Sequence, residues 1–498
     1  MMKRPILWAV LVAMLALGAC GGGSDSPVAD AVPADTVPGE PTPPSPVAVD
    51  RIEPLDTATL ARAVQAKAAQ VVASRMPVGA VTPRVALGPL ESVKAARDDV
   101  LKIGQGRVVD ATASVSDLAG MLRWNKLTDG SQVAALAFSS DGARAIRLGV
   151  LARQLPAGAV LRFYGESGTA VVEMSAAQIE AMRDINEAGG LTGDAARTVW
   201  GPDTDGAVST LEVQLPAASA TSQLQLAVPQ LSHLTQSIDQ AANALDTADI
   251  GAAGPCNLDV MCTADLQAES RAVAKLLFVD QGDAYVCSGT LMNDIHNSLT
   301  PYFMTAAHCI SGQAAASSAI TYWFFRAASC NSSPVYDPAM TRIASGAQLL
   351  YTDVPADQTL LQLNSPPPDR VVYAGSYYSS PFGPGAVPSA DVLGVHHPKG
   401  DLQKYSVGII QGYSICGTNG CAPSSAESGN MYTVGWLRGT TEPGSSGSPL
   451  FTTLGVTHYV IGALSRGAGS CRNLSGKDFY SRINRSSLDT GIQDWLMH

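Results

Sequence analysis

Residues 441–449 carry the sequence Thr-Glu-Pro-Gly-Ser-Ser-Gly-Ser-Pro, followed by the apolar pair Leu450 and Phe451. Taken alone, a Gly/Ser-rich run of this kind is an ordinary turn before a strand. Two upstream stretches change that interpretation. Residues 305–309 read Thr-Ala-Ala-His-Cys, and residues 357–363 read Asp-Gln-Thr-Leu-Leu-Gln-Leu. Histidine, aspartate and serine therefore occur in that order, each in a separate motif.

These three residue types together can build a nucleophile. A serine hydroxyl becomes reactive when a neighbouring base takes its proton, and a buried carboxylate keeps that base in the right tautomer. Ser446, His308 and Asp357 offer the three groups. His308 could instead be a core histidine beside a disulfide, and Asp357 a turn residue that opens a strand. Because three separate motifs agree, we predict that these residues form a catalytic triad.

The last half of the chain resembles the lysyl endopeptidase branch of the chymotrypsin-like serine peptidases, from about residue 256 to residue 498. The stretches that carry the resemblance are 256–262, 287–291, 302–309, 395–398 and 441–449. The resemblance implies an all-β catalytic domain of two six-stranded antiparallel barrels, with the active site in the cleft between them. It further implies a serine endopeptidase that acts on proteins or peptides and needs neither a cofactor nor a metal.

The same resemblance assigns roles around the nucleophile. It places the oxyanion hole at the backbone N–H groups of Gly444 and Ser446, since a glycine lets the backbone approach the reacting oxygen. Residues 462–467, which include Ser465, resemble a wall of the primary specificity pocket. Asp478 aligns with the acid that meets a substrate lysine. A carboxylate at the base of an apolar slot selects a cation, because any other side chain leaves it buried and unpaired.

Two points about this pocket stay open. Asp478 could be a surface residue paired with Lys477 or Arg466. Arg466, in a pocket wall, would weaken the selection of a cation. The sequence therefore predicts cleavage after lysine without excluding arginine.

Ser445 departs from the zymogen-type relatives. In those proteins this position is an aspartate that pairs with a newly freed amino terminus, and a serine cannot form that ion pair. Activation by insertion of a new amino terminus is therefore doubtful for this chain.

The resemblance also implies a set of disulfides. Carried over residue by residue, it pairs Cys256 with Cys471, Cys262 with Cys330 and Cys287 with Cys309, the last of which clamps the loop bearing His308. Cys416 and Cys421 remain, and they would close a small local loop that the family pattern lacks.

A zinc site is the competing interpretation of the cysteines and histidines. Cys416 and Cys421 have no nearby histidine, and an exported chain favours oxidation of its thiols. His396 and His397 could suggest a metal, yet they belong to a stretch that matches the family, so a structural or cleft-wall role is preferred.

Residues 1–20 have the pattern of a bacterial export signal. Lys3 and Arg4 precede an uncharged apolar run that is too short for a membrane span. The last four residues, Leu-Gly-Ala-Cys, resemble the processing box of lipoproteins, in which the cysteine is lipidated. A plain secretory signal that ends in cysteine is the alternative. We favour lipidation of Cys20, because removing it from the nine cysteines leaves an even number.

The leader also predicts where the protein lies. Gly21, Gly22 and Gly23 follow Cys20, and the absence of an acidic residue there resembles lipoproteins of the outer membrane. Residues 21–50 are rich in proline and lack basic and aromatic residues, which is typical of an extended tether. We therefore expect an exported protein anchored by lipid in the outer membrane, with release of the catalytic domain left open.

Between the tether and residue 256 the sequence predicts three segments. Residues 51–107 are expected to be helical, on the Ala-rich helical spacing of residues 57–76. Residues 108–230 contain five alternating runs bounded by turn residues, which predicts a smaller β-rich, sandwich-like domain. Residues 231–255 are expected to be a helical linker that ends at the Gly/Pro-rich boundary. For the β-rich domain we leave folding-aid, inhibitory and spacer roles open.

Composition narrows the function further. The chain of 498 residues has 46% hydrophobic residues, as a globular protein does, and a net charge of −11 at pH 7. This charge and the lack of a basic run argue against nucleic acid as a partner. Two hypotheses remain: a lipid-anchored serine endopeptidase, and a surface-displayed binding lipoprotein on an inactive peptidase scaffold. The sequence does not indicate an oligomeric state.

Overall fold

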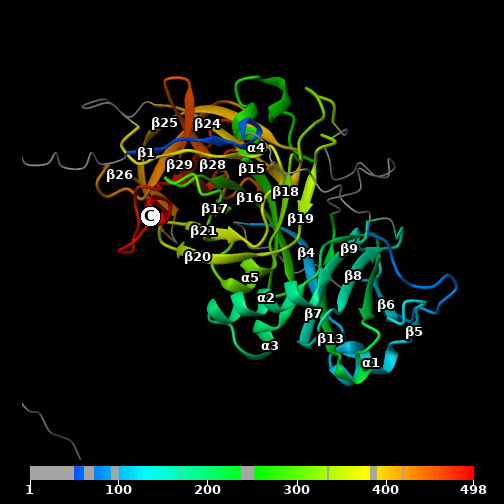
Figure 1. The fold of residues 1–498 in the computed structure, drawn as a ribbon. Helices are drawn as coiled ribbons and strands as arrows, with labels where there is room; N and C mark the ends of the chain where they lie inside the picture. Colours follow the sequence, from blue (N-terminus) through cyan, green and yellow to red (C-terminus); the bar gives the residue numbers. More distant parts are fainter. Residues whose placement is uncertain are drawn as a thin grey trace, which may run out of the picture. The chain divides into compact units, whose positions relative to one another are not determined.

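The computed structural model describes residues 50–60, 72–90, 100–168, 170–236, 252–333, 336–381, 390–417 and 420–498. The predicted signal with Cys20 and the tether up to residue 49 lie outside these residues. Strands dominate the described part (Figure 1), so the all-β class is confirmed. Within the same residues, no helix combines the length and the apolar character that crossing a membrane requires.

Residues 84–234 form a sandwich of two β-layers. The first layer is a six-stranded sheet in the order β3-β6-β12-β8-β9, with β5 paired to β6. Its strands are β3 (Arg84–Leu87), β5 (Asn125–Lys126), β6 (Gln132–Ser140), β8 (Val160–Gly165), β9 (Val172–Ser175) and β12 (Val208–Leu215). The second layer contains β4 (Leu101–Val108), β7 (Ala145–Gln154), β10 (Thr198–Trp200), β11 (Thr204–Asp205) and β13 (Gln225–Leu234).

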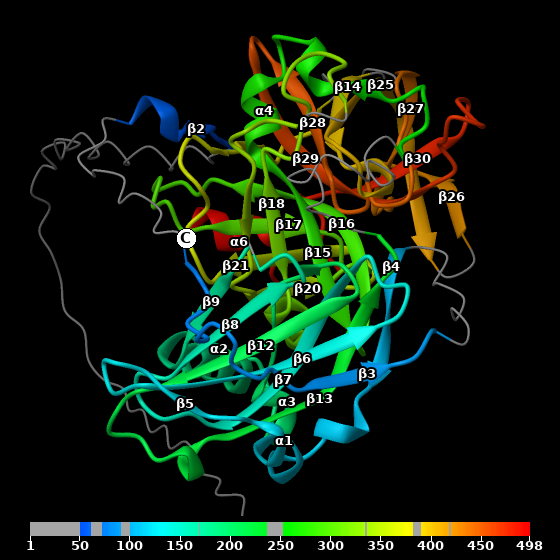
Figure 2. The same cartoon turned by 90° about the vertical axis from the view of Figure 1, so that its right-hand side faces the viewer.

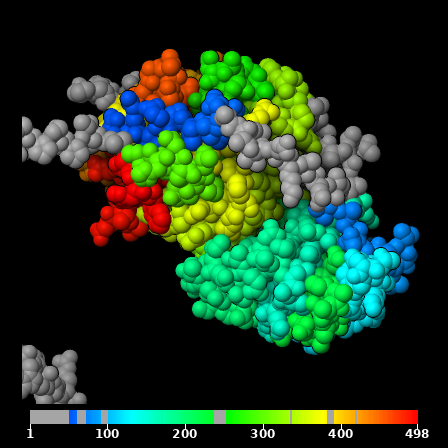
Figure 3. All heavy atoms as spheres, viewed as in Figure 1, coloured from blue at the N-terminus to red at the C-terminus, as the bar shows by residue number. Residues whose placement is uncertain are grey.

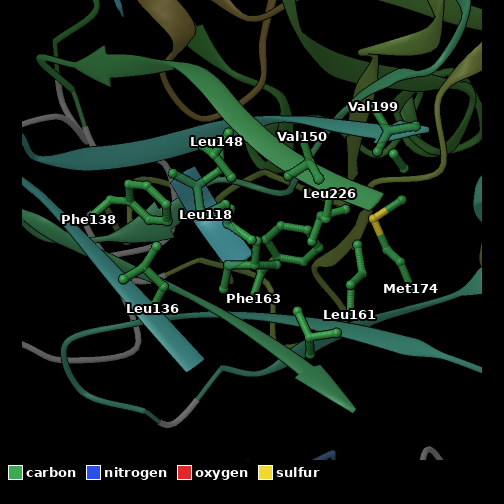
Figure 4. Close-up of a cluster of buried hydrophobic side chains, with 14 of the residues drawn as sticks. Leu118, Leu136, Phe138, Leu148, Val150, Leu161, Phe163, Met174, Val199 and Leu226 are labelled. Atoms are coloured by element: carbon green, nitrogen blue, oxygen red, sulfur yellow. The ribbon is translucent and has the colours of Figure 1, made fainter. Parts of the chain in front are cut away.

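Alternating side chains explain why these strands pair. Leu136 and Phe138 of β6 face Leu148 and Val150 of β7, and Phe163 of β8 lies among them in one apolar core (Figure 4). All five are fully buried. A strand whose alternate residues are apolar must cover that face, and two such layers cover each other.

Short helices complete the sandwich. They are η2 (Asp110–Thr112), α1 (Val115–Met121), α2 (Ala176–Ala188), α3 (Gly193–Ala196) and η3 (Thr221–Gln223). α2 begins at Ser175, whose side chain accepts from the N–H of Gln178 while the Gln178 side chain accepts from the N–H of Ser175. This reciprocal capping satisfies amides that the first helical turn leaves unpaired.

β4 joins the sandwich to the catalytic domain. It pairs antiparallel with β13 on one edge and with β16 (Asp283–Met292) on the other, so one sheet continues from the sandwich into the first barrel (Figure 2). On the β16 side Leu101 lies opposite Val286. The buried Arg147 of β7 adds a second connection, since its guanidinium donates to the carbonyl of Ser318 in the catalytic domain (2.7 Å). In Figure 3 the two regions pack directly against each other.

The first barrel of the catalytic domain lies between residues 273 and 363. The strands pair in the order β19-β18-β15-β16-β17-β21-β20. They are β15 (Val273–Asp280), β16, β17 (Tyr302–Thr305), β18 (Ile320–Trp323), β19 (Thr341–Ile343), β20 (Ala347–Asp353) and β21 (Gln358–Leu363). The starts of β20 and β18 come together where the N–H of Gly346, just before β20, donates to the carbonyl of Ala319, just before β18. The barrel thus uses the six expected strands and a short seventh, β19.

The second barrel closes completely. Six strands follow each other in the order β29-β28-β24-β25-β27-β30, and β30 pairs again with β29. They are β24 (Ala390–His396), β25 (Lys404–Gly417), β27 (Met431–Arg438), β28 (Pro449–Leu454), β29 (Thr457–Gly467) and β30 (Lys477–Ser481). β26 (Gly420–Ser424) extends β25 as a hairpin. A closed barrel leaves no free edge, so its strands hold fixed positions.

The remaining elements lie around the barrels. They are β1 (Arg51–Ile52), β2 (Leu55–Asp56), η1 (Thr57–Thr59), β14 (Leu258–Asp259), η5 (Val260–Cys262), α4 (Gln267–Ala272), α5 (Gln313–Ser317), β22 (Val372–Tyr373), β23 (Ser376–Tyr377), η6 (Pro398–Gly400) and α6 (Ile492–Met497). β1 and β2 pair with β23 and β22, so residues 51–56 pack on the catalytic domain.

Two predicted helices are wrong in their described parts. The segment 51–107 contains β1 to β4 and one short 3-10 turn, while residues 61–71 lie outside the described residues. The linker 231–255 begins inside β13, which runs to Leu234, and residues 237–251 are likewise outside. In β13, pairing with two neighbouring strands decides the conformation over a local helical spacing of apolar residues.

Candidate active site

The nucleophile loop, residues 440–447, connects β27 to β28 and carries Ser446. Gly447 has a positive φ of 78°. A Cβ there would lie 2.2 Å from Thr305 Oγ1 and 2.6 Å from the carbonyl oxygen of Ser288. A glycine is therefore required for the loop to approach the first barrel this closely. Ser446 is 8% exposed, and its carbonyl accepts from the N–H of Ser288 (2.8 Å).

His308 and Asp357 are held by two paired strands. His308 lies just after β17 and Asp357 just before β21, and these strands are antiparallel neighbours. One carboxylate oxygen of Asp357 accepts from the backbone N–H of His308 (2.8 Å) and the other bonds the ring Nδ1 (2.8 Å). The carboxylate thus fixes both the backbone and the ring of one residue, which sets the orientation of the imidazole.

Asp357 is built to stay ionised. Burial alone would raise the pKa of Asp357, but the charge of His308 and the hydrogen bonds from its ring and backbone outweigh burial and hold that pKa below its ordinary value. An ionised carboxylate accepts a hydrogen bond from Nδ1–H, so in the neutral imidazole of His308 the lone pair lies on Nε2. Nε2 is buried and has no hydrogen-bond partner among the described residues.

The backbone of the nucleophile loop presents two amides. Gly444 has a positive φ of 97°, and neither its N–H nor that of Ser446 donates to another protein group within the described ranges. A Cβ at Gly444 would meet the carbonyl oxygen of His397 at 2.9 Å. Both amides can therefore donate to an oxygen that carries developing negative charge.

A pocket of about 120 Å³ opens beside Ser446. Its lining residues come from the nucleophile loop and from the end of β29 with the turn that follows: Thr441, Glu442, Pro443, Ser446, Leu464, Ser465, Arg466, Gly467 and Gly469. The predicted wall, residues 462–467, thus contributes four residues to the lining next to Ser446.

Asp478 lies directly behind this pocket and is fully buried. A Cβ on Gly467 would lie 1.8 Å from Asp478 Oδ1, so only glycine fits between the carboxylate and the pocket. Oδ2 accepts from Trp436 Nε1 and from Thr441 Oγ1 (2.6 Å each), and Oδ1 accepts from the N–H of Gly469 (3.0 Å). The alternative of a surface Asp478 paired with Lys477 or Arg466 is wrong.

Burial raises the pKa of Asp478, although the hydrogen bonds from Thr441, Trp436 and Gly469 pull it down in part. All three neighbours are donors. A site with donors only suits a carboxylate that carries its charge and still has lone pairs to offer.

Ser465 and Arg466 have different surroundings. Ser465 is buried, lines the pocket, and its hydroxyl contributes to lowering the pKa of Asp357 without forming a well-aligned hydrogen bond. Arg466 is exposed and its guanidinium donates to the carbonyl of Gly417 (3.1 Å). The positive charge of Arg466 therefore points along the surface and does not fill the pocket.

The structure contains the three disulfides that the resemblance implied and the local Cys416–Cys421 bond predicted for the two remaining cysteines. Cys287, His308 and Cys309 form the one group of three metal-ligating residue types found close together in the described residues. The two sulfur atoms are bonded to each other, so no thiolate remains to bind a metal there. His396 and His397 are fully buried and hydrogen-bonded to protein groups.

The start of β4 borders the site, which sequence reasoning missed. Val100 is buried in the core cluster that includes Cys287 and Cys309. Leu101 pairs with Val286, and its Cδ2 atom would lie 3.1 Å from a Cβ on Gly444. Nothing local in the sequence connects residue 101 with residue 444. Sequence reasoning also missed Trp436 as a partner of Asp478, because the two meet only through the pairing of β27 with β30.

Comparison with known proteins gives the family. A model described as "Lysyl endopeptidase, C-terminal domain" matches residues 250–481, and one described as "Lysyl endopeptidase N-terminal domain" matches residues 83–235. A curated "Lysyl endopeptidase" from Pseudomonas aeruginosa is 31% identical over 386 residues, which cover 73% of this chain and 77% of the relative. The chain belongs to the lysyl endopeptidase family. It is a serine endopeptidase, and the alternative of an inactive binding scaffold loses its support.

Solved structures give weaker similarities. The Rv3671c protease from M. tuberculosis in its active form has a TM-score of 0.30 and 16% identity, covering 48% of this chain and 87% of that one. The MamO protease domain from Magnetospirillum magneticum has a TM-score of 0.29 and 13% identity, and the match covers 44% of this chain and 94% of that one. The two family models coincide with the sandwich and with the catalytic domain, so both are characteristic of lysyl endopeptidases.

Proposed function

We propose that this lysyl endopeptidase cuts peptide bonds after lysine with Ser446, His308 and Asp357 as its triad. The observation that carries the proposal is the contact between His308 and Asp357, in which one carboxylate bonds both the backbone N–H and the ring Nδ1 of His308. The nucleophile loop packs against the same strand end, where Gly447 approaches Thr305 and Ala306.

The reaction follows from these positions. Ser446 Oγ attacks the scissile carbonyl carbon and passes its proton to Nε2 of His308, while Asp357 stabilises the resulting imidazolium without taking a proton. The carbonyl oxygen becomes an oxyanion that the amides of Gly444 and Ser446 bind. His308 then protonates the leaving amine, and an acyl-enzyme remains on Ser446. Water, activated by His308 in the same way, releases the acid and restores the serine.

The preference for lysine rests on Asp478. The carboxylate lies directly behind Gly467 of the pocket wall and is surrounded by hydrogen-bond donors. A substrate ammonium at the base of the pocket would therefore form an ion pair that is shielded from water. Since burial raises the pKa of Asp478, an incoming cation would favour its ionised form. Arginine remains the second candidate substrate, as the guanidinium is also a cation.

The first test is hydrolysis of a mixed peptide library by the purified full chain, with cleavage sites read by mass spectrometry. Ser446→Ala is the control, because it removes the nucleophile and leaves the pocket. We expect cleavage after lysine that falls by about a millionfold in the control, leaving no detectable products. Cleavage that persists in Ser446→Ala would exclude this triad.

A second prediction concerns the pocket. Asp478→Ser should lower kcat/KM for lysyl substrates by about a hundredfold or more, since a substrate cation then loses its buried partner. Cleavage after an apolar residue should change far less. Asp391→Ser, at an exposed position of β24, is the matched control. An equal loss for lysyl and apolar substrates would exclude Asp478 as the specificity residue.

We also propose that the N-terminal sandwich restrains the active site of the full chain. β4 pairs with β16 at Val286, two residues before Ser288, which bonds the nucleophile loop. At about 3.4 Å per residue, Leu101 lies within about 7 Å of that contact along the strand. A substrate that fills the pocket must continue past Gly444, where the side chain of Leu101 lies. β4 therefore competes with the part of the substrate beyond the scissile bond.

The third prediction follows from this competition. Val100→Asp should raise the rate of peptide hydrolysis by the full chain about tenfold or more, because an unpaired carboxylate among buried apolar side chains costs several kcal/mol and loosens β4 from β16. Val108→Asp, at the other end of β4 and 69% exposed, is the matched control. Leu101→Ser offers a milder test if Val100→Asp fails to fold. An unchanged rate in a folded variant would exclude the restraint.

For localisation we propose lipid anchoring at Cys20, in the outer membrane. The support is the leader sequence and the cysteine count, since eight cysteines outside the leader form four disulfides. Cys20→Ser should move the protein from the membrane fraction to the soluble fraction, as measured by immunoblotting after fractionation. A variant that still sediments with membranes would contradict the anchor.

A further inference from the structure

The residue before the nucleophile has an unusual partner. Ser445 is fully buried, and its Oγ lies 2.9 Å from Nδ1 of His396, which is 49 residues away at the end of β24. The other ring nitrogen, Nε2, lies 3.1 Å from Oγ of Ser406 on β25. Both nitrogens of a fully buried imidazole are thus used, and one partner belongs to the nucleophile loop.

The protons in this network have one consistent arrangement. Ser406 Oγ donates to the carbonyl of Thr440 (2.8 Å), so its oxygen accepts from Nε2–H of His396. Nδ1 then carries the lone pair and accepts from Ser445 Oγ–H, while Ser445 Oγ accepts from the N–H of Glu442 (3.3 Å). Burial, with the charge of Lys404, lowers the pKa of His396 to about 3, so the ring is neutral with one donor and one acceptor.

The network fixes the backbone of the nucleophile loop at both ends. Thr440 and Glu442 flank Thr441, which bonds Asp478 behind the pocket. Ser445 lies between the two residues whose amides face the oxyanion. One imidazole therefore links the specificity pocket, the oxyanion amides and the wall of the second barrel.

Among the described residues just ahead of the catalytic domain, Ala253 and Gly254 bond side chains other than that of Ser445. The N–H of Gly254 donates to Glu442 Oε2 (2.7 Å), and the N–H of Ala253 donates to Asp401 Oδ2 (3.0 Å). A new amino terminus near these residues would thus meet Glu442 or Asp401. The place that an ion pair could occupy at Ser445 already holds a neutral hydrogen bond from within the second barrel.

We infer that His396 is a positioning residue that holds the nucleophile loop in its oxyanion-binding conformation through Ser445, without any contribution from a free amino terminus. The inference rests on the proposed triad. The nucleophile loop is thus preorganised in the uncut chain, and the geometry of the loop depends on the acceptor at Nδ1 of His396.

A series of variants at residue 396 tests this inference in the full chain. His396→Phe keeps the ring and removes both nitrogens. In His396→Asn, the amide oxygen can take the place of Nδ1 and accept from Ser445, whereas in His396→Gln the longer amide reaches Ser406 and leaves Ser445 without an acceptor. We expect kcat on a lysyl peptide to fall about tenfold to a hundredfold in His396→Phe and His396→Gln. KM should stay within about twofold of the wild-type value in these variants, and His396→Asn should keep most of the wild-type kcat.

Affinity for a peptide aldehyde that ends in lysine gives a second measurement, because the aldehyde oxygen occupies the oxyanion position once Ser446 adds to it. Its inhibition constant should rise in proportion to the loss of kcat. His458→Phe is the matched control, since His458 is a partly buried histidine of the same barrel that bonds Glu269. This control should leave kcat and aldehyde affinity unchanged.

The outcomes separate the two proposals. A wild-type chain that hydrolyses no lysyl peptide contradicts the proposed function. If the wild type is active, a folded His396→Phe with wild-type kcat, or a Gln variant as active as Asn, overturns the inference. If His396→Phe does not fold, Ser445→Ala decides: it removes only the hydroxyl that donates to Nδ1, and an unchanged kcat overturns the inference as well.

Discussion

The geometry of the site depends on how Ser288 holds the nucleophile loop. Its N–H donates to the carbonyl of Ser446, and its hydroxyl donates to the carbonyl of Gly444 (3.0 Å). The same hydroxyl accepts from the N–H of His397 (3.0 Å) in the second barrel. One serine of the first barrel thus holds the carbonyls of Gly444 and Ser446. The amides of the same two peptide units, the N–H groups of Ser445 and Gly447, donate to the carbonyls of Glu442 and Leu464, so the peptide units on both sides of Ser446 are held in place. Because every group is buried, losing one bond would leave an unpaired polar atom, which costs about 1–3 kcal/mol.

The two barrels contribute different things to this arrangement. The first supplies the proposed base: β17 and β21 bring His308 and Asp357 together, and the Cys287–Cys309 disulfide ties β16 to the segment after His308. The second supplies the proposed nucleophile, the pocket and Asp478. Its complete closure matters for the pocket, since β30 must pair with both β27 and β29 to place Asp478 behind the glycines at the end of β29. In the proposed reaction, specificity therefore depends on the closed second barrel, and catalysis depends on the interface between the two barrels.

Local patterns in the sequence predicted those parts of the fold that local physics determines. β6 and β12 alternate apolar residues between turn signals, and no other conformation covers such a face, so these strands were predicted correctly. The helix predicted to begin at Leu231 is wrong in its described part, because an apolar spacing of three residues also occurs in a strand, and pairing with β4 and β7 determines the conformation there. Three disulfides followed from family resemblance, and the fourth, Cys416–Cys421, from the two cysteines that remained. The bond between Ser445 and His396 spans 49 residues and two strands, and no local signal could show it.

The position of β4 explains why the sandwich and the catalytic domain form one structural unit. A strand edge with unpaired N–H and C=O groups invites another strand, and β16 offers such an edge beside the active site. In the full chain β4 satisfies this edge with its own backbone and adds the apolar side chains of Val100 and Leu101. A peptide substrate that extends past Ser446 would use the same edge. Backbone pairing carries little sequence information, so the edge can accept β4 and many substrates alike. In the proposed function, the pocket in front of Asp478 therefore selects the bond that is cleaved.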